Sequence, residues 1–394
     1  MLGSFKEEFA NITQLQEAGS VVSLQNTDEL SKIKEYSTKN DLVIWGCGVR
    51  GNYAIKQFQR MGIPITGICD RDKAGTTCCG YPVMSPEKLV REHPQAYFIV
   101  ATTRYHAEIS AALQDMGISG ERILPFPFTD VSLIPPIVIS QEDFKSKYQE
   151  GYQWAYNFFQ DEHSRKIVLD RIAMYLHSTP LERSAKSPQY FESSIVRLKD
   201  GEVFVDGGGY VGDTVLSFVR EIEQSGASWR HIYTFEPEAE HLETMQQALA
   251  QIRDVDIVPS GLWSEKTELD FLVAQDSSSS CLTTAYGLNV EHKTVKVSVT
   301  ALDCYFSNLP EEEWPTFIKM DIEGSEKEAL IGAKRIIKAK RPKLAICVYH
   351  KPEDIYELTE LIHRYVPDYS FFLRQCAAGY YETVLYAVPK EDIE

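Results

Sequence analysis

Residues 201–212 read GEVFVDGGGYVG, and this stretch constrains the fold more than any other in the chain. Its apolar run, residues 203–205, suits a buried parallel strand and leads directly into Asp206 and three glycines. Apolar residues then recur at helical spacing: Val215, Leu216, Val219 and Ile222. A strand, an acidic residue, a glycine loop and a helix, in this order, predict an α/β domain that brings bare backbone close to a nucleotide-like ligand.

A second glycine loop lies upstream. The run Leu42–Trp45 reads as a buried strand, and Gly46, Gly48 and Gly51 follow it with the spacing GxGxxG. Asp70 comes nineteen residues after Gly51, where a ribose partner would lie. The unit is about half of a full dinucleotide fold. Two interpretations stay open, a nucleotide or nucleotide-sugar site and glycines that only permit tight packing.

Composition limits the classes of partner. The formal net charge of −17 argues against nucleic acid, because phosphate binding needs a basic surface. No run of 18 apolar residues and no signal pattern appears, so we expect a soluble cytoplasmic protein without a membrane span. None of the eight cysteines forms a CxxC pair, which argues against a zinc or disulfide framework. A homo-oligomer stays open.

The chain divides into four expected segments. Residues 1–40 form an N-terminal helical segment, 41–130 a small Rossmann-like domain, 131–199 an aromatic-rich helical linker or cover, and 200–394 a second α/β domain. Apolar runs predict seven strands in the last segment, the final two as an antiparallel pair at one edge. We therefore expect two doubly wound α/β domains joined by a helical segment.

Polar residues follow several of these C-terminal strands. Glu236 ends the second strand, thirty residues after Asp206, where a carboxylate can accept both hydroxyls of a ribose. Ser260 follows the third strand, beside the place of a nucleoside base. Asp321 ends the fourth strand and His350 the fifth. The polar loop 275–280, between two alternating strands, is expected to be either surface or a lid.

The motifs FVDGGGYVGDT, YTFEPE, FIKMDIEGSEKEALIGAKRII and YYETVLYAV closely resemble those of the FkbM family of methyltransferases. The resemblance covers residues 200–389 and implies a seven-stranded class I sheet with S-adenosylmethionine as the cofactor. It also implies O-methylation of a sugar or another small-molecule or glycan product, such as a polysaccharide intermediate. The stretches WGCGVRG, GICDRDKAG and GYPVMSPEKL resemble the small N-terminal domain of sugar acetyltransferases, which implies nucleotide or nucleotide-sugar binding.

The resemblance assigns roles to individual residues. The residues expected to bind the cofactor are Asp206, Gly207, Gly208, Gly209, Gly212, Glu236, Ser260 and Asp321. His350 is the first choice of general base, because an imidazole titrates near working pH. Glu323 and Lys319 are the other catalytic candidates, and no complete metal-ligand set is apparent. Two alternatives are an NAD-dependent oxidoreductase using the upstream loop and a non-catalytic nucleotide-sugar-binding scaffold.

Overall fold

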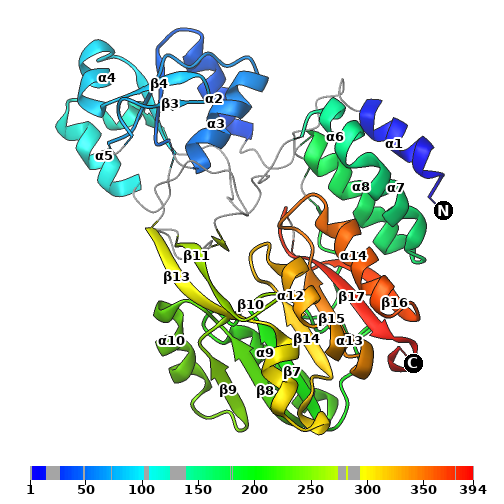
Figure 1. Ribbon diagram of the computed structural model, residues 1–394. Helices are drawn as coiled ribbons and strands as arrows, with labels where there is room; N and C mark the ends of the chain where they lie inside the picture. The colour runs from blue at the N-terminus through cyan, green and yellow to red at the C-terminus, as the bar shows by residue number, and fades with distance from the viewer. Residues whose placement is uncertain are drawn as a thin grey trace. The chain divides into compact units, whose positions relative to one another are not determined.

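A computed structural model describes residues 2–14, 27–47, 49–71, 73–101, 106–124, 139–177, 179, 181–273, 281–282, 293–377 and 379–393. The chain divides into two compact units (Figure 1). Gly19–Ile134 forms one, and Met1–Ala18 joins Pro135–Glu394 in the other. Within the described residues, no helix is both long and apolar enough to cross a membrane.

The unit Gly19–Ile134 is built on a six-stranded sheet with the order β3-β4-β2-β1-β5-β6. All neighbouring strands run parallel except β3 and β4. The strands are β1 (Leu42–Trp45), β2 (Gly67–Cys69), β3 (Thr77–Cys78), β4 (Tyr81–Met84), β5 (Tyr97–Val100) and β6 (Ile123–Leu124). The helices are α2 (Thr27–Ser37), α3 (Val49–Arg60), α4 (Pro86–Glu92) and α5 (His106–Asp115), with a 3-10 turn at Gly120–Arg122. Two apolar clusters pack on the sheet, as a doubly wound domain requires.

The larger unit contains a seven-stranded sheet with the order β16-β17-β15-β14-β7-β8-β9. The strands are β7 (Glu202–Gly207), β8 (Trp229–Phe235), β9 (Val255–Val258), β14 (Phe317–Met320), β15 (Lys343–Cys347), β16 (Tyr369–Gln375) and β17 (Thr383–Pro389). Five run parallel, and β16 and β17 form the expected antiparallel pair at one edge. Because β7 lies centrally, its glycine loop opens at the carboxyl edge beside β8 and β14.

Helices cover this sheet. They are α9 (Asp213–Ser225), α10 (Ala239–Leu249), α11 (Leu302–Tyr305), α12 (Glu326–Gly332), α13 (Lys334–Lys340) and α14 (Asp354–Tyr365). Short 3-10 turns lie at Phe306–Asn308, Glu311–Glu313 and Lys390–Asp392. The core between these layers mixes aliphatic and aromatic side chains, and Phe204 of β7 stacks on Phe218 of α9 with ring centroids 4.3 Å apart. The packed layers fix the ends of the parallel strands.

The helical segment before this sheet packs onto its β16 edge and onto α14 (Figure 1). It comprises α6 (Gln141–Lys147), α7 (Gln149–Phe158) and α8 (Glu162–His177), and α1 (Phe5–Gln14) packs on it through Phe5 and Tyr156. Ser164 Oγ accepts the N–H of Leu373 at 2.7 Å, which ties α8 to β16. The fully buried Arg171 of α8 donates to the carbonyl of Tyr380 at 2.8 Å.

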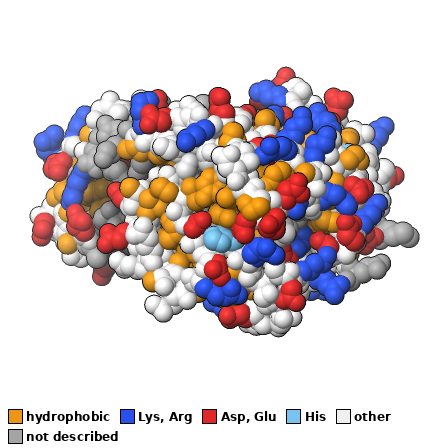
Figure 2. Space-filling model, turned by 60° about the horizontal axis from the view of Figure 1, so that its bottom comes forward, with side chains coloured by type: hydrophobic (Ala, Val, Ile, Leu, Met, Phe, Trp, Pro, Cys, Tyr) orange, Lys and Arg blue, Asp and Glu red, His pale blue; other side chains and the backbone are white. Residues whose placement is uncertain are grey.

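A smaller sheet has the order β10-β13-β11-β12, formed by β10 (Gly261–Leu262), β11 (Thr267–Val273), β12 (Cys281–Leu282) and β13 (Lys293–Thr300). The expected antiparallel pair is β11 with β13, and the loop 275–280 lies outside the described residues. Phe271, Val297 and Val299 give this sheet an apolar face. On the face in Figure 2, the described acidic and basic side chains are intermixed around hydrophobic ones.

Candidate functional site

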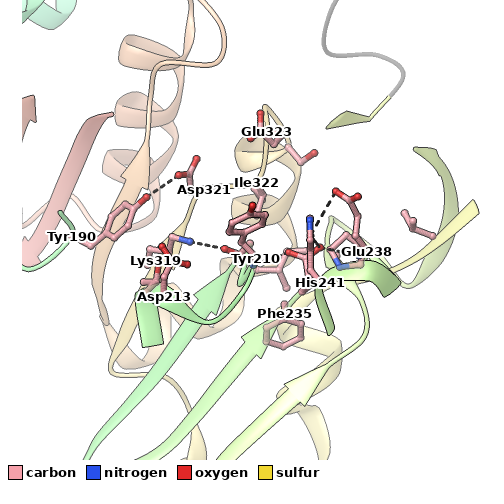
Figure 3. A pocket seen from close by; sticks show the side chains of 18 of the residues that line it. Tyr190, Tyr210, Asp213, Phe235, Glu238, His241, Lys319, Asp321, Ile322 and Glu323 are labelled. Atoms are coloured by element: carbon pink, nitrogen blue, oxygen red, sulfur yellow. Dashed lines mark hydrogen bonds and ion pairs between the residues drawn. The ribbon is translucent and has the colours of Figure 1, made fainter. Parts of the chain in front are cut away.

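A pocket of about 480 Å³ lies at the carboxyl edge of β7, β8 and β14 (Figure 3). We call it the edge pocket, and six of the residues that line it are Tyr190, Gly208, Glu236, Asp321, Glu323 and Tyr349. Phe271, Val297 and Val299 of the smaller sheet line one wall. The volume suits a ligand of nucleoside size, and the pocket lies where open α/β sheets bind nucleotides.

Strained backbone gathers around this pocket. Seven described residues other than glycine have positive φ angles, and four of them line it: Tyr190 at 70°, Tyr210 at 46°, Glu323 at 53° and Glu382 at 65°. Each such conformation costs on the order of 1 kcal/mol or more, so it persists only where the surrounding structure holds it. Such outliers concentrate at functional sites, which supports the edge pocket as the site of chemistry.

The glycine loop needs glycines for close approach. A Cβ on Gly208, whose φ is 80°, would lie 1.9 Å from the carbonyl oxygen of Asp321. A Cβ on Gly209 would lie 2.1 Å from Thr234 Oγ1, and one on Gly207 would lie 2.7 Å from Leu262. Gly208 lines the edge pocket. The remaining loop glycine, Gly212 with φ 87°, begins α9 in contact with α10.

Asp206 and Lys319 form a buried ion pair beneath this loop. Their atoms Oδ1 and Nζ lie 2.9 Å apart, and the side chains are 0% and 2% exposed. Lys319 also donates to the carbonyls of Gly207 at 3.1 Å and Gly208 at 2.8 Å. Burial opposes its charge, but the Asp206 and Asp321 carboxylates together raise the pKa of Lys319. Its ammonium therefore stays charged and holds the glycine loop (Figure 3).

Glu236 is buried at the end of β8, as expected. Its Oε2 accepts the N–H of Tyr210 at 2.9 Å, and its Oε1 accepts that of Glu238 at 2.8 Å. These bonds fix the carboxylate at the pocket wall. Ser260 is placed differently, because its hydroxyl donates to the backbone carbonyls of Gly261 and Ser298, both at 3.2 Å. Its side chain thus bridges the backbones of the paired strands β10 and β13.

Two tyrosines outside the expected cofactor-binding and catalytic sets hold Asp321, and only Tyr190 lies in a segment expected to reach the ligand. Tyr190 donates to Oδ2 at 2.8 Å, and Tyr349 donates to Oδ1 at 2.7 Å. Burial opposes ionisation of Asp321, but His350, Lys319 and the two hydroxyls together lower its pKa. Asp321 is therefore a fixed anion in the edge pocket. The available signal for Tyr190 was its place in the run 189–191, just before the glycine strand.

The other two catalytic candidates lie side by side, with His350 Nε2 3.6 Å from Glu323 Oε2. Glu323 lines the pocket with 37% of its side chain exposed, and burial raises its pKa to about 7. His350 is 1% exposed and lies behind it. Burial opposes its charge, but Glu326, Glu323 and Asp321 raise the pKa of His350 to about 10. At neutral pH Glu323 can accept a proton, whereas His350 already carries one.

Two histidine–carboxylate groups have the residue types of a metal site. Their candidate ligand atoms lie within 4.8 Å of one another in each group: Glu236, Glu238 and His241 in one, Asp321, Glu326 and His350 in the other. In the second group, His350 Nδ1 lies 3.1 Å from Glu326 Oε1, so these two side chains already face one another. In the first, His241 Nδ1 lies 3.5 Å from Glu236 Oε1 and 4.0 Å from Glu238 Oε1. We interpret both as charge networks.

In the smaller unit, the described residues of the upstream glycine loop contact one another and Asp70. A Cβ on Gly51 would lie 1.9 Å from the carbonyl oxygen of Gly46, whose φ is 115°. Asp70 accepts the N–H groups of Cys47 at 2.8 Å and Lys73 at 3.2 Å, while Gly48 lies outside the described residues. These contacts give Gly46, Gly51 and Asp70 a packing role, and a nucleotide there stays a prediction.

Comparisons with known proteins agree with this geometry. Residues 206–376 match the model of the methyltransferase FkbM domain. The crystal structure of methyltransferase FkbM from Methylobacillus flagellatus KT is similar, with 20% identity, a TM-score of 0.53, and coverage of 97% of this chain and 98% of that one. At this identity the likeness shows the fold, which includes a class I methyltransferase-like sheet in the C-terminal unit. No curated protein matches the chain.

Other solved structures match about half of this chain. A precorrin-6y C5,15-methyltransferase from Geobacter metallireducens GS-15 has 12% identity and a TM-score of 0.30, covering 50% of this chain and 84% of its own. A fibrillarin from Aeropyrum pernix with bound S-adenosyl-L-methionine has 10% identity and a TM-score of 0.31, covering 48% and 67%. The family match over the glycine loop, Glu236 and Asp321 favours methyl transfer over the oxidoreductase alternative. Residues 206–376 of this chain thus match the methyltransferase FkbM domain, within a unit that has the matching fold.

Proposed function

We propose that the protein is an O-methyltransferase acting on a hydroxyl of a sugar or of another small-molecule or glycan biosynthetic product. One observation carries this proposal. Glu323 presents a carboxylate to the edge pocket, and its pKa is raised to about 7 by burial, so it can take up a hydroxyl proton at neutral pH. A base near the working pH is what a hydroxyl acceptor needs, since its proton must leave as the new bond forms.

The chain's own residues can hold the cofactor in this pocket. Glu236, fixed by two backbone N–H groups, would accept the ribose hydroxyls. Gly208 would let the methionine part lie against bare backbone, and the anionic Asp321 would take its ammonium group. When bound, the cofactor supplies an electrophilic methyl group on a sulfonium. The apolar wall of Phe271, Val297 and Val299 would exclude water from the adenosine side.

Glu323 and Asp321 would then divide the work at the acceptor. Asp321 is anchored by Tyr190 and Tyr349 and stays ionised, so it orients groups without exchanging a proton. Glu323 would take the proton from the acceptor hydroxyl, whose oxygen would receive the methyl group as the cofactor leaves as S-adenosylhomocysteine. The main contribution of the pocket is this positioning, since an in-line displacement depends on alignment of the reacting atoms.

The test is methyl transfer from S-adenosylmethionine to a panel of neutral sugars, amino sugars and nucleotide-sugars, with mass spectrometry to locate the new methyl group. We expect an O-methyl ether as the product. Glu323→Gln should lower turnover about 10²- to 10⁴-fold while leaving cofactor affinity unchanged. Glu265→Gln is the matched control, because Glu265 is exposed and lies outside the pocket lining.

Two outcomes would contradict the proposal. Methylation of nitrogen alone would replace the hydroxyl acceptor with an amine, and full turnover of Glu323→Gln would remove this carboxylate from the reaction. Binding of S-adenosylhomocysteine without transfer to any member of the panel would instead favour the non-catalytic scaffold.

The unit Gly19–Ile134 is proposed to bind the nucleotide or carrier part of the substrate, and calorimetry with nucleotide-sugars and an Asp70→Ala variant tests that role.

A further inference from the structure

A single buried imidazole lies behind the acceptor side of the edge pocket, among three carboxylates. His350 Nδ1 is 3.1 Å from Glu326 Oε1, on the side away from the pocket. Its Nε2 is 3.4 Å from Asp321 Oδ1 and 3.6 Å from Glu323 Oε2, on the pocket side. The ring is thus interposed between one carboxylate that is 1% exposed and two that line the cavity.

The first of these contacts is anchored. Glu326 Oε1 also accepts the N–H of Ile322 at 2.9 Å, so it is tied to the segment between Asp321 and Glu323. Glu326 therefore fixes both the backbone that carries the two pocket carboxylates and the imidazole that contacts them. Glu323 has a left-handed φ of 53° and Gly324 one of 88°, a conformation that must be held from outside. The network supplies that restraint.

We propose that His350 is a positioning residue: as an imidazolium locked by Glu326, it holds Asp321 and Glu323 in one arrangement and keeps Glu323 available as a proton acceptor. It does not touch the acceptor, because its ring is 1% exposed. This inference rests on the proposed function of Glu323. It replaces the general-base role expected from the sequence with an electrostatic one.

The charges around the ring support this role. Glu326 faces it from α12, Asp321 and Glu323 from the loop after β14, and Asp354 from the start of α14. Lys351 is the next residue in the chain, and its ammonium donates to the carbonyl of Gly324. Several carboxylates packed together would repel one another, and a central cation offsets that repulsion. A neutral ring at the same place would not offset the repulsion between the carboxylates.

The consequence for Glu323 has a definite sign. Burial raises the pKa of Glu323, and the charge of His350 lowers it, so the value of about 7 reflects both effects. Removing the imidazolium leaves burial and the neighbouring carboxylates unopposed. The Glu323 carboxyl would then keep its proton well above neutral pH and would be a poor base there.

The experiment measures the titrations of the Glu323 carboxyl and the His350 imidazole directly, and it needs no methyl acceptor. The full-length protein is labelled with ¹³C at glutamate carboxyls and with ¹⁵N in histidine rings, and NMR spectra are recorded across pH. The Glu323 and His350 signals are assigned by their loss in Glu323→Gln and His350→Gln. In His350→Gln we expect the titration midpoint of Glu323 to rise by about one pH unit or more. The exposed His163 provides the control His163→Gln, which should leave it unchanged.

An unchanged Glu323 midpoint in a His350→Gln variant that still binds S-adenosylhomocysteine would overturn the proposal. If His350→Gln does not fold, the Glu326→Gln variant is measured instead. In Glu326→Gln the titration midpoint of His350 should fall by about one pH unit or more, and an unchanged His350 midpoint would overturn the locking role. These results are separate from the proposed function, which fails if Glu323→Gln retains full turnover whatever the titrations show.

Discussion

Replacing Lys319 by methionine should destabilise the larger unit rather than only slow its chemistry. The substitution keeps the approximate length of the side chain but leaves the fully buried Asp206 carboxylate without its ion pair. In the wild-type protein Lys319 Nζ lies 2.9 Å from Asp206 Oδ1. It also removes the donor to the carbonyls of Gly207 and Gly208. Breaking one partner of a buried pair costs about 3–5 kcal/mol, so we expect a loss of about 4 kcal/mol. Total domain stabilities of about 5–15 kcal/mol make this a large fraction.

The assay is urea unfolding without ligand, with Asp206→Asn and the double variant completing a double-mutant cycle. Asp206→Asn removes the buried charge, so the double variant should be more stable than Lys319→Met, with a coupling energy of about 2 kcal/mol or more. Lys338→Met, at an exposed position of α13, should change the free energy of unfolding by less than about 0.5 kcal/mol. A cost below about 1 kcal/mol for Lys319→Met, with normal cofactor binding and lost turnover, would instead make Lys319 catalytic.

Two further predictions concern His350 and Gly208. The pKa of His350 is raised from 6.5 to about 10, so its stabilisation is complete below pH 6.5 and is lost as pH rises through 10. The urea midpoint should therefore fall between pH 7 and pH 9.5, and a His350→Gln variant with the same fall would contradict this. Gly208→Ala would place a Cβ 1.9 Å from the Asp321 carbonyl and must displace the loop. Calorimetry should show S-adenosylhomocysteine affinity at least about 100-fold lower, the equivalent of about 3 kcal/mol, and retained affinity would refute the close approach.

The parts of the fold and site that the sequence predicted are those encoded by nearby residues. The apolar run 203–205, the glycines after it and the helical spacing beyond lie within one short stretch, so their pattern identifies β7, its loop and α9. Glu236 and Asp321 each come directly after the last residue of a strand. Parallel strands place such ends at one edge, and both residues line the edge pocket as expected.

The contacts that decide what each residue does come from distant parts of the chain. Lys319 meets Asp206 because β14 and β7 pair in that register, which no local pattern reveals. Tyr190 reaches Asp321 across 131 positions of sequence, and its approach depends on a left-handed backbone. His350 has an ordinary strand-end sequence context, and only its burial against Glu326 changes its protonation. These features follow from packing and electrostatics in the folded chain.

The cofactor site is tested most directly by a calorimetric titration of the full-length protein with S-adenosylhomocysteine, repeated on Glu236→Ala. One binding site per chain is expected, because the glycine loop after β7, Glu236 and Asp321 converge on the edge pocket. Loss of the buried carboxylate should lower affinity about 10- to 100-fold, since hydrogen bonds to charged groups contribute about 1.5–3 kcal/mol. The absence of binding to the wild-type protein, or undiminished affinity of Glu236→Ala, would contradict the assignment of the edge pocket as the cofactor site.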